Sequence, residues 1–538
     1  MPGSGSLSDR RRLPRVVLGA VLLVLLAVGA GGAAASSGSV HAEISQLTWG
    51  VPQTIRSLDY THSGDPGTAS VVFLAMEPLV KYDAQGHLRP DLASSFSIRN
   101  PTTYVYNLRK GVKFSDGQPL TTADVIYSLQ QSASKKNGSE LATFFGSVKS
   151  MTATGPNQVT IKLKGPNPFF RYSLAVTPIG EKAFWSQHLK DIGTPGVMNM
   201  GTGPFKFVSF TPDQGVTLAR NDGYWGKKPS IQNLNLKFIT DPNTLLLAIR
   251  SHQVDGTFKV PQDQIGQYKS LSGIGVSLVP EQLAAYYSLD VEDPPFTDIH
   301  VRRAMAYATN KTGMVKAVLR GYGQPAPTMP PPQQWGDLMS QAKVRSLYAS
   351  LPQYTFSLAK AKAELAKSAD PNGFTTTVTF PDAHPELGKA LLVLAQDLKS
   401  LGITLNVKQV PISQWLNKLY THPKPMGMQV GNWSVDYPDP ADALSLIYPS
   451  ANATKNSFNT ANYKNPTMDA LIAKQNNSVS ESARAAIIAK ALRLAATDVP
   501  YVPLWYQEFA VALNSKYRYS NVSTWYEYQP WAEDISPK

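Results

Sequence analysis

Alternation of hydrophobic and polar residues predicts short strands near the start of the chain. Residues 43–50 (EISQLTWG) read as a first strand, and residues 95–99 (SFSIR) and 104–109 (YVYNLR) flank the turn pair Asn100-Pro101. In the last of these segments Tyr104, Tyr106 and Leu108 occupy alternate positions, as on one face of a half-buried strand. This part of the chain is therefore predicted to form antiparallel β-structure.

A different period, typical of amphipathic helices, marks other segments. Thr121 and Asp124 have the spacing of a capping box before residues 123–131, and the apolar run of residues 68–80 predicts another helix. Residues 389–410 read as a helix, a stop at Gly402 and a strand, and residues 481–507 repeat this order. Such steps from helix to strand predict an α/β protein built from mixed sheets.

The proline-rich segment 323–336 (GQPAPTMPPPQQWG) is unsuited to a helix or a central strand. It contains the apolar residues Met329 and Trp335, which a flexible linker would not need. We therefore expect an ordered surface loop there.

The first 42 residues have the layout of an export signal. Arg10, Arg11, Arg12 and Arg15 precede an apolar run at 16–30, and small residues at 33–35 and 40–42 offer two cleavage sites. An uncleaved membrane anchor is the alternative, but the run is short for a full span, so the pattern favours cleavage. In either case we expect the remaining chain to lie outside the cytoplasm.

Composition excludes several classes of protein. The 538 residues are 42% hydrophobic and 17% charged, a globular balance that suggests about three domains. The absence of cysteine excludes disulfides, thiolate metal sites and a lipid-modified cysteine, so we expect no lipoprotein anchor. The net charge of +13 falls to +10 without residues 1–42, but Lys and Arg are scattered, which argues against nucleic-acid binding.

No motif indicates catalysis, a metal or a cofactor. None of the eight histidines is spaced to bind one metal with another from a single helix turn, and Walker A and G-x-S-x-G motifs are lacking. The GTGPF segment at 201–205 lacks the third glycine of a dinucleotide site, so a tight turn explains it better. A Ser/His/Asp site assembled from distant residues stays open, and an exported hydrolase is the alternative class.

An ordered series of segments resembles the extracellular solute-binding proteins of family 5, the peptide- and nickel-type receptors of ATP-binding-cassette (ABC) importers. Each motif alone is weak, but their shared order along nearly the whole chain after residue 45 is specific. Phe205, where a Tyr is common, and Asn310, where an Asp is common, are small departures. The segments are RPDLASSFSIRNPTTYVYNLRKGVKFSDGQPLTTADVIYSL (89–129), GTGPFKF (201–207), LARNDGYWGKKPSIQNLNLKFITD (218–241), YYSLDVEDPPFTDIHVRRAMAYATNK (286–311), GYGQPAP (321–327), GNWSVDYPDPAD (431–442) and DVPYVPLWY (498–506).

The resemblance implies a two-lobed periplasmic-binding-protein clamshell of mixed sheets with an extra inserted domain. Chain crossings near 286–289 and 500–503 would form its hinge. The domain boundaries that it implies are 1–42 for the export signal or anchor, 43–88, 195–285 and 500–538 for lobe I, 89–194 for the inserted domain and 286–499 for lobe II.

The resemblance also indicates a binding residue in the segment NWSVDYPDP (432–440). In peptide-binding relatives an Asp at the position of Asp436 holds the α-ammonium group of the ligand, with Trp433, Tyr437 and Asn432 beside it. A carboxylate between aromatic rings is poorly solvated, which favours pairing with a cation. The alternative is that Asp436 caps a local turn, and for Asp439, which directly precedes Pro440, we favour the turn cap.

The function implied is that of a monomeric, non-enzymatic receptor outside the cytoplasmic membrane, in the periplasmic space or at the cell surface. It would capture short peptides and deliver them to ABC permease subunits. Some oligopeptide binders place an Arg before the loop Trp to meet a ligand carboxylate, but MGMQVGNW (426–433) has none. Another solute (a metal chelate, an oligosaccharide or a glycopeptide) is the alternative within the same fold.

Overall fold

The computed structural model describes residues 42–538, so nearly all of the predicted export signal lies outside the described residues. A nine-stranded mixed sheet runs in the order β16-β12-β17-β11-β1-β10-β9-β8, and β13 pairs with β17 at its side. The first strand is confirmed as β1. The strands of this sheet are β1 (Ile44–Val51), β8 (Phe205–Thr211), β9 (Gly215–Arg220), β10 (Ile231–Phe238), β11 (Gly256–Thr257), β12 (Ile274–Leu289), β13 (Gly323–Pro325), β16 (Met428–Ser434) and β17 (Tyr501–Asn514).

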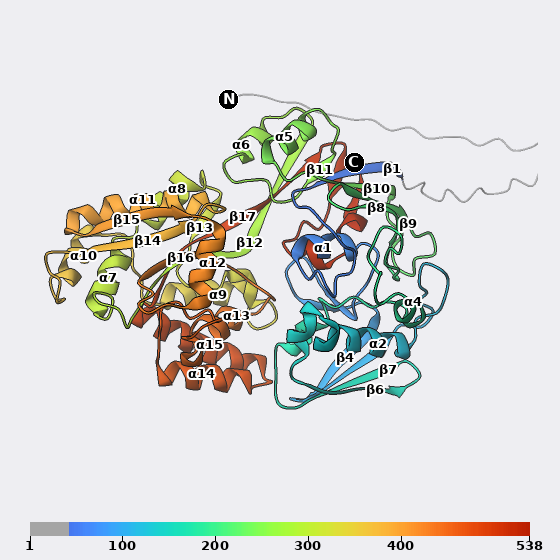
Figure 1. Cartoon of the computed structure of the whole chain (residues 1–538), viewed down its shortest axis with the longest axis horizontal. Coiled ribbons are helices and arrows are strands. Elements are labelled where there is room, and N and C mark those ends of the chain that lie inside the picture. The colour runs from blue at the N-terminus through green and yellow to red at the C-terminus, as the bar shows by residue number, and fades with distance from the viewer. Residues whose placement is uncertain (1–41) are drawn as a thin grey trace, which may run out of the picture. The chain divides into compact units, whose positions relative to one another are not determined.

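The two longest strands, β12 and β17, join the two ends of this sheet (Figure 1). They pair antiparallel from Ile274↔Asn514 to Ser288↔Tyr501, and the register shifts at Pro280/Ala284 and again at Ala285/Tyr286. Such bulges bend a strand and interrupt its ladder. The predicted hinge segments 286–289 and 500–503 lie just beyond these shifts.

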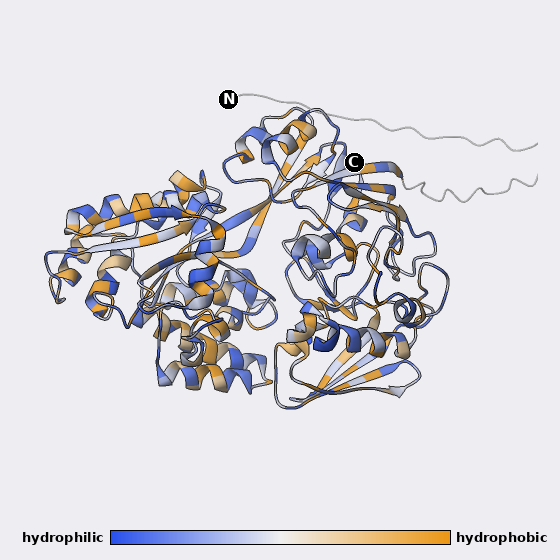
Figure 2. Cartoon of the chain, in the orientation of Figure 1, coloured by the Kyte–Doolittle hydropathy of each residue, from blue (hydrophilic) through white to orange (hydrophobic). Residues whose placement is uncertain are grey.

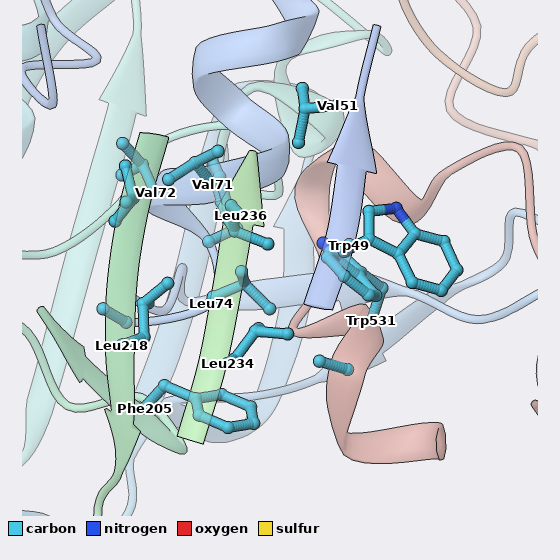
Figure 3. Packing of buried hydrophobic residues seen from close by; sticks show 14 of the residues in the cluster. Trp49, Val51, Val71, Val72, Leu74, Phe205, Leu218, Leu234, Leu236 and Trp531 are labelled. Atoms are coloured by element: carbon cyan, nitrogen blue, oxygen red, sulfur yellow. The ribbon is translucent and has the colours of Figure 1, made fainter. Parts of the chain in front are cut away.

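One hydrophobic core packs between the nine-stranded sheet and helix α1 (Pro66–Val72). Val71 and Val72 of the helix face Leu218, Leu234 and Leu236 on neighbouring strands (Figure 3). Trp49 of β1 packs on Trp531, with ring centroids 4.8 Å apart. The C-terminal segment therefore completes the core built by the first strand.

The predicted hairpin region forms a separate four-stranded antiparallel sheet, ordered β4-β5-β7-β6. Hydrophobic and hydrophilic bands alternate along its strands (Figure 2), and helix α2 (Thr122–Ser132) covers one face. The predicted capping box is confirmed, because Thr121 and Asp124 bond each other's backbone N–H groups. The strands are β4 (Ala93–Asn100), β5 (Thr103–Leu108), β6 (Val148–Gly155) and β7 (Gln158–Leu163).

Residues 286–499 contain most of the helices and the parallel pair β14 (Thr375–Pro381) and β15 (Thr404–Val410). The predicted step from helix to strand is confirmed there. Helix α11 ends before Gly402, whose φ of +75° suits a residue without a side chain, and β15 follows. The helices are α7 (Ile299–Tyr307), α8 (Lys311–Val318), α9 (Gln341–Ser350), α10 (Leu358–Leu365), α11 (Pro385–Leu398), α12 (Ile412–Thr421), α13 (Ala441–Ile447), α14 (Pro466–Asn476) and α15 (Glu481–Asp498).

The remaining elements are short. Strands β2 (Val80–Tyr82) and β3 (Leu88–Pro90) form one hairpin, and β18 (Tyr517–Tyr519) pairs with β19 (Ile535–Pro537). Short helices lie between the sheets: α3 (Phe170–Ser173), α4 (Lys182–Gln187), α5 (Pro242–Arg250) and α6 (Ile265–Lys269).

Two predictions need correction. The helix expected over 68–80 ends at Val72: Pro78 has no N–H to donate, and Glu77 is held by side-chain donors and by a bridge to Ile179. The proline-rich segment is ordered, as predicted, but it is not a surface loop. Met329 and Trp335 are fully buried, and the indole of Trp335 donates to the Tyr348 hydroxyl at 2.8 Å. Hydrophobic burial decided the second outcome, whereas the missing donor of Pro78 and the polar contacts of Glu77 decided the first.

Within residues 42–538 no helix is long and apolar enough to cross a bilayer. The boundaries between the lobes and the inserted domain remain predictions.

Candidate ligand-binding site

The segment singled out by the sequence connects strand β16 to helix α13. Trp433 is the penultimate residue of β16, and α13 begins at Ala441, directly after Pro440. The Asp439 carboxylate accepts a hydrogen bond from the Ala441 N–H at 3.0 Å. The predicted turn cap at Asp439 is therefore confirmed.

Asp439 also has a second role that the sequence did not indicate. Its carboxylate forms a two-pronged ion pair with Arg484 of α15, at 2.9 Å (Nη1–Oδ2) and 3.0 Å (Nη2–Oδ1). Both side chains are buried, so each charge depends on the other for its solvation. This partner lies 45 residues away, beyond the reach of local pattern analysis.

Asp442, two residues beyond the segment, is fully buried and pairs with no cation among residues 42–538. Its Oδ2 accepts a hydrogen bond from the Trp433 indole at 3.0 Å. Burial, together with the nearby charge of Asp436, raises the pKa of Asp442 well above its ordinary value. The bond fixes the Trp433 ring, which packs in a hydrophobic cluster and is only 8% exposed.

Asp436 differs from both of its neighbours. Among residues 42–538 it has no ion pair and its carboxylate accepts no side-chain hydrogen bond. The side chain reaches solvent but lies in a concave surface, and burial by the surrounding protein atoms raises the pKa of its carboxyl group. Of the three carboxyl groups, Asp436 is the one open to an external cation.

Asp436 lines a small cavity of about 170 Å³ whose opposite wall comes from residues 143–176. Tyr437 stacks on Tyr172, with ring centroids 5.4 Å apart and planes at 5°, and packs at 5.1 Å against Phe169. Aromatic rings from two distant parts of the chain therefore line the cavity beside the exposed Asp436. The lining residues are Thr143, Phe144, Asn167, Phe169, Tyr172, Ser173, Val176, Asp436 and Tyr437.

Asn432 is placed apart from this cavity. Its side-chain amide donates to the Glu386 carboxylate at 3.3 Å, and it is not one of the cavity's lining residues. Trp433 does not line the cavity either, because its ring is held by Asp442 within a hydrophobic cluster.

Polar contacts also connect helix α3 to this segment and to α15. Arg171 pairs with Glu481 at 2.9 Å and donates to the Tyr172 hydroxyl at 2.8 Å. That hydroxyl lies 3.4 Å from the Asp439 carboxylate, and the Arg484 guanidinium lies 5.3 Å from the centre of the Phe169 ring. Sequence analysis missed Phe169, Arg171 and Tyr172, because their roles depend on contacts across more than 260 residues.

A larger cavity of about 360 Å³ lies on the other side of the segment. It is bordered by the β2–β3 turn, by β12, by residues 333–341 and by residues 522–524. Gln282 of β12 lines it, and the Gln282 carbonyl accepts a hydrogen bond from the Val435 N–H at 3.3 Å. The volume lies at the lower end of the range for small-molecule sites.

Within the described part of the chain, no cluster of three or more His, Asp or Glu side chains could hold a metal ion.

Comparison with known proteins shows the family. Residues 87–455, more than half of the chain, match the family described as bacterial extracellular solute-binding proteins, family 5. The glutathione-binding protein GsiB of Pectobacterium atrosepticum is 27% identical over 473 residues, which cover 87% of this chain and 89% of that protein.

Solved structures show the fold. HbpA2 of Haemophilus parasuis has a TM-score of 0.80 at 23% identity, over 92% of this chain and 100% of that one. The ABC transporter-associated periplasmic binding protein DppA of Helicobacter pylori, in complex with the peptide STSA, has a TM-score of 0.72 at 23% identity, over 92% and 98%. The predicted mixed α/β periplasmic-binding-protein fold is therefore confirmed.

The family consists of solute-binding proteins and not of enzymes, which confirms that prediction. The chain therefore belongs to the bacterial extracellular solute-binding proteins of family 5.

Proposed function

We propose that this receptor captures short peptides outside the cytoplasmic membrane, pairs their α-ammonium group with Asp436, and delivers them to ABC permease subunits. The observation that carries the proposal is the state of Asp436, a carboxylate in an aromatic cavity without a cation among the described residues. An ammonium group would supply the missing charge and form charge-assisted hydrogen bonds.

The surroundings of Asp436 suit this ligand. The rings of Tyr437, Tyr172 and Phe169 exclude water on one side, which strengthens an ion pair made there. Aromatic faces also attract cations. GsiB, named for glutathione, and DppA, which holds a peptide, are relatives with ligands of this class.

The test combines a change in the protein with a change in the ligand. Asp436→Asn keeps the size of the side chain but removes its charge, so affinity should fall by roughly 2–5 kcal/mol, about 30-fold or more. N-acetylation of the peptide should cost the wild-type protein a similar amount and the variant much less, because both changes remove one interaction. Calorimetry on the four combinations measures the coupling.

Asp263→Asn is the matched control, because Asp263 is exposed on a distant loop and should leave affinity unchanged. If the two losses simply add, Asp436 does not hold the amine. Native mass spectrometry of protein purified without refolding would identify a co-purified ligand. A neutral oligosaccharide found there, with affinity indifferent to Asp436→Asn, would replace the peptide proposal.

A further inference from the structure

The larger cavity has a polar but uncharged wall. Four glutamines, three hydroxyl-bearing residues and His87 contribute to its lining, and none of the lining residues is Asp, Glu, Lys or Arg. The Nδ1 atom of His87 lies 3.0 Å from the Asp83 carboxylate, which Arg89 also contacts at 2.7 Å, so this ring nitrogen already has a partner. A carboxylate or an ammonium group placed in this cavity would meet no free opposite charge on its wall, which is unfavourable.

Two of these glutamines carry buried polar atoms that lack a partner. Gln282 is only 7% exposed, and neither its Oε1 nor that of Gln333 accepts a hydrogen bond from residues 42–538. Exchanging oxygen and nitrogen in either amide would leave a buried N–H group unpaired instead, so the need for a partner remains. Buried polar groups in native proteins nearly always have partners, and an apolar occupant would leave these two amides unpaired.

Two other residues that line the cavity already use their side chains in hydrogen bonds within the protein. The Gln341 amide donates to the Pro332 carbonyl at 2.9 Å, and the Ser523 hydroxyl accepts from the Trp525 N–H at 3.0 Å. Gln282 and Gln333 are the lining residues with a buried amide oxygen that has no partner among residues 42–538.

We propose that this cavity binds an uncharged group that both donates and accepts hydrogen bonds, a carboxamide or a hydroxyl, through the side chains of Gln282 and Gln333. It adjoins the segment of Asp436: the Gln282 carbonyl holds Val435, and a Cβ added to Gly86 would lie 3.0 Å from Pro438. If the proposed function holds, on which this last step rests, the preferred substrates are peptides carrying Asn, Gln, Ser or Thr side chains.

The cavity can be tested without any peptide. Met339 lines it, so its methyl group, labelled with carbon-13, reports occupancy by nuclear magnetic resonance, while the fully buried Met305 of α7 serves as the reference. The probes are propionamide, propionate and propylammonium, which are similar in size but differ in charge. We expect propionamide to shift the Met339 signal at about fivefold lower concentration than either ion, and Gln282→Leu to abolish that preference.

Equal responses to the three probes, no response to any of them, or a preference for an ion would overturn the proposal. No response to any probe would mean that the cavity holds water only. A preference for an ion would mean that the cavity serves a charged ligand.

Stability of the unliganded protein separates a binding role from a structural one. An amide without a partner contributes nothing that a leucine cannot replace, so Gln282→Leu and Gln333→Leu should keep or raise the melting temperature. A marked fall in both variants would mean that these amides support the fold, which would overturn the binding role. Gln267→Leu, at an exposed glutamine of α6, is the matched control.

The expected preference for peptides with uncharged polar side chains is measured separately. Tripeptides of alanine with one position changed to Asn, Asp, Lys or Leu are compared by calorimetry. We expect Asn to bind about three- to tenfold more tightly than the others at one position, and Gln282→Leu to remove that difference. If no tripeptide binds, the proposed function fails while the result with the small probes stands on its own. If peptides bind but Asp or Lys is preferred, the assignment of this cavity is wrong.

Discussion

The carboxyl groups of Asp436, Asp439 and Asp442 lie within seven residues but in three different environments. The environments differ because the three groups differ in their access to a cation. Asp439 is neutralised by Arg484, Asp442 is buried among apolar groups with a raised pKa, and Asp436 remains open to an external partner. Residue type and spacing alone do not distinguish the three, because the deciding partner comes from another element.

The pair Asp439–Arg484 predicts a large effect on stability. Arg484→Met leaves the Asp439 carboxylate buried without compensation, so the free energy of unfolding should fall by about 3–5 kcal/mol. The double variant Arg484→Met/Asp439→Leu removes both charges and should be clearly more stable than the single one. Urea unfolding followed by fluorescence gives the comparison, and equal losses in the two variants would contradict the argument.

His62 predicts a local dependence on pH. Its Nδ1 lies 2.6 Å from the Asp59 carboxylate and its Nε2 lies 2.6 Å from the Asn137 carbonyl, so both nitrogens face acceptors. Burial lowers the pKa of His62, but the bonds to Asn137 and Asp59 outweigh it and raise the pKa above the ordinary value of about 6.5. The contribution of the protonated His62 to the stability of the folded protein is therefore complete below pH 6.5. This contribution is lost as the pH rises through the pKa that His62 has in the folded state.

Titration of the imidazole signals by nuclear magnetic resonance measures this directly. Asp59→Asn should lower the pKa of His62, because it removes the charge of the carboxylate that faces Nδ1. A His62 pKa at or below 6.5 in the wild-type protein would show that burial prevails over the two bonds.

At the scale of elements, helix α3 and helix α15 meet through one ion pair next to the candidate site. The Arg171 side chain is largely buried, but Glu481 is 44% exposed, so the pair is worth only about 0.5–1 kcal/mol. It joins the segment that provides Tyr172 to the part of the chain that carries Arg484. If the predicted lobes close on a ligand, this pair would add a small contribution to the contacts of the ligand itself.

Charge reversal tests this contact. Arg171→Glu should weaken ligand binding by about two- to fivefold, mainly through faster dissociation, and adding Glu481→Arg should recover most of the loss. Stopped-flow dissociation kinetics of wild type, both single variants and the swap give the coupling. Failure of the swap to recover any affinity would mean that Arg171 acts through its bond to the Tyr172 hydroxyl.

At the scale of the molecule, β12 and β17 connect the two predicted lobes, and the register shifts at Pro280/Ala284 and Ala285/Tyr286 interrupt their pairing. Interrupted pairing beside a chain crossing is where a hinge bends with the least loss of hydrogen bonds. Apart from one further shift between β8 and β9 at Phe207/Ser209, the rest of the sheet is regularly paired and would move as rigid parts.

Ligand binding should then compact the protein without changing its secondary structure. Small-angle scattering should give a smaller radius of gyration with saturating ligand, while far-ultraviolet circular dichroism stays the same. An unchanged radius would count against closure, unless the free protein is already closed. Arg171→Glu addresses that case, because it should enlarge the free form and leave the liganded form compact.

The sequence by itself determined the features that depend on neighbours along the chain. The capping box at Thr121 and Asp124 and the stop of α11 at Gly402 follow from interactions over a few residues. Strand β5 forms where it was expected, although Val105 is buried as well as Tyr104 and Tyr106, so the strand is not half-buried. The sequence also determined the family, through an ordered series of such motifs. Where local signals conflicted, as at Pro78 and in the proline-rich segment, the predictions were wrong about extent or burial.

Only the tertiary structure decided which of these residues meet. Asp439 is separated from Arg484 by 45 residues, and Tyr172 from Asp439 by 267, yet these contacts distinguish Asp436 from its neighbours. The two unpartnered glutamines of the larger cavity likewise come from separate elements. The physical reason is that charge pairing and burial depend on distance in space, and the packing of the whole core sets that distance.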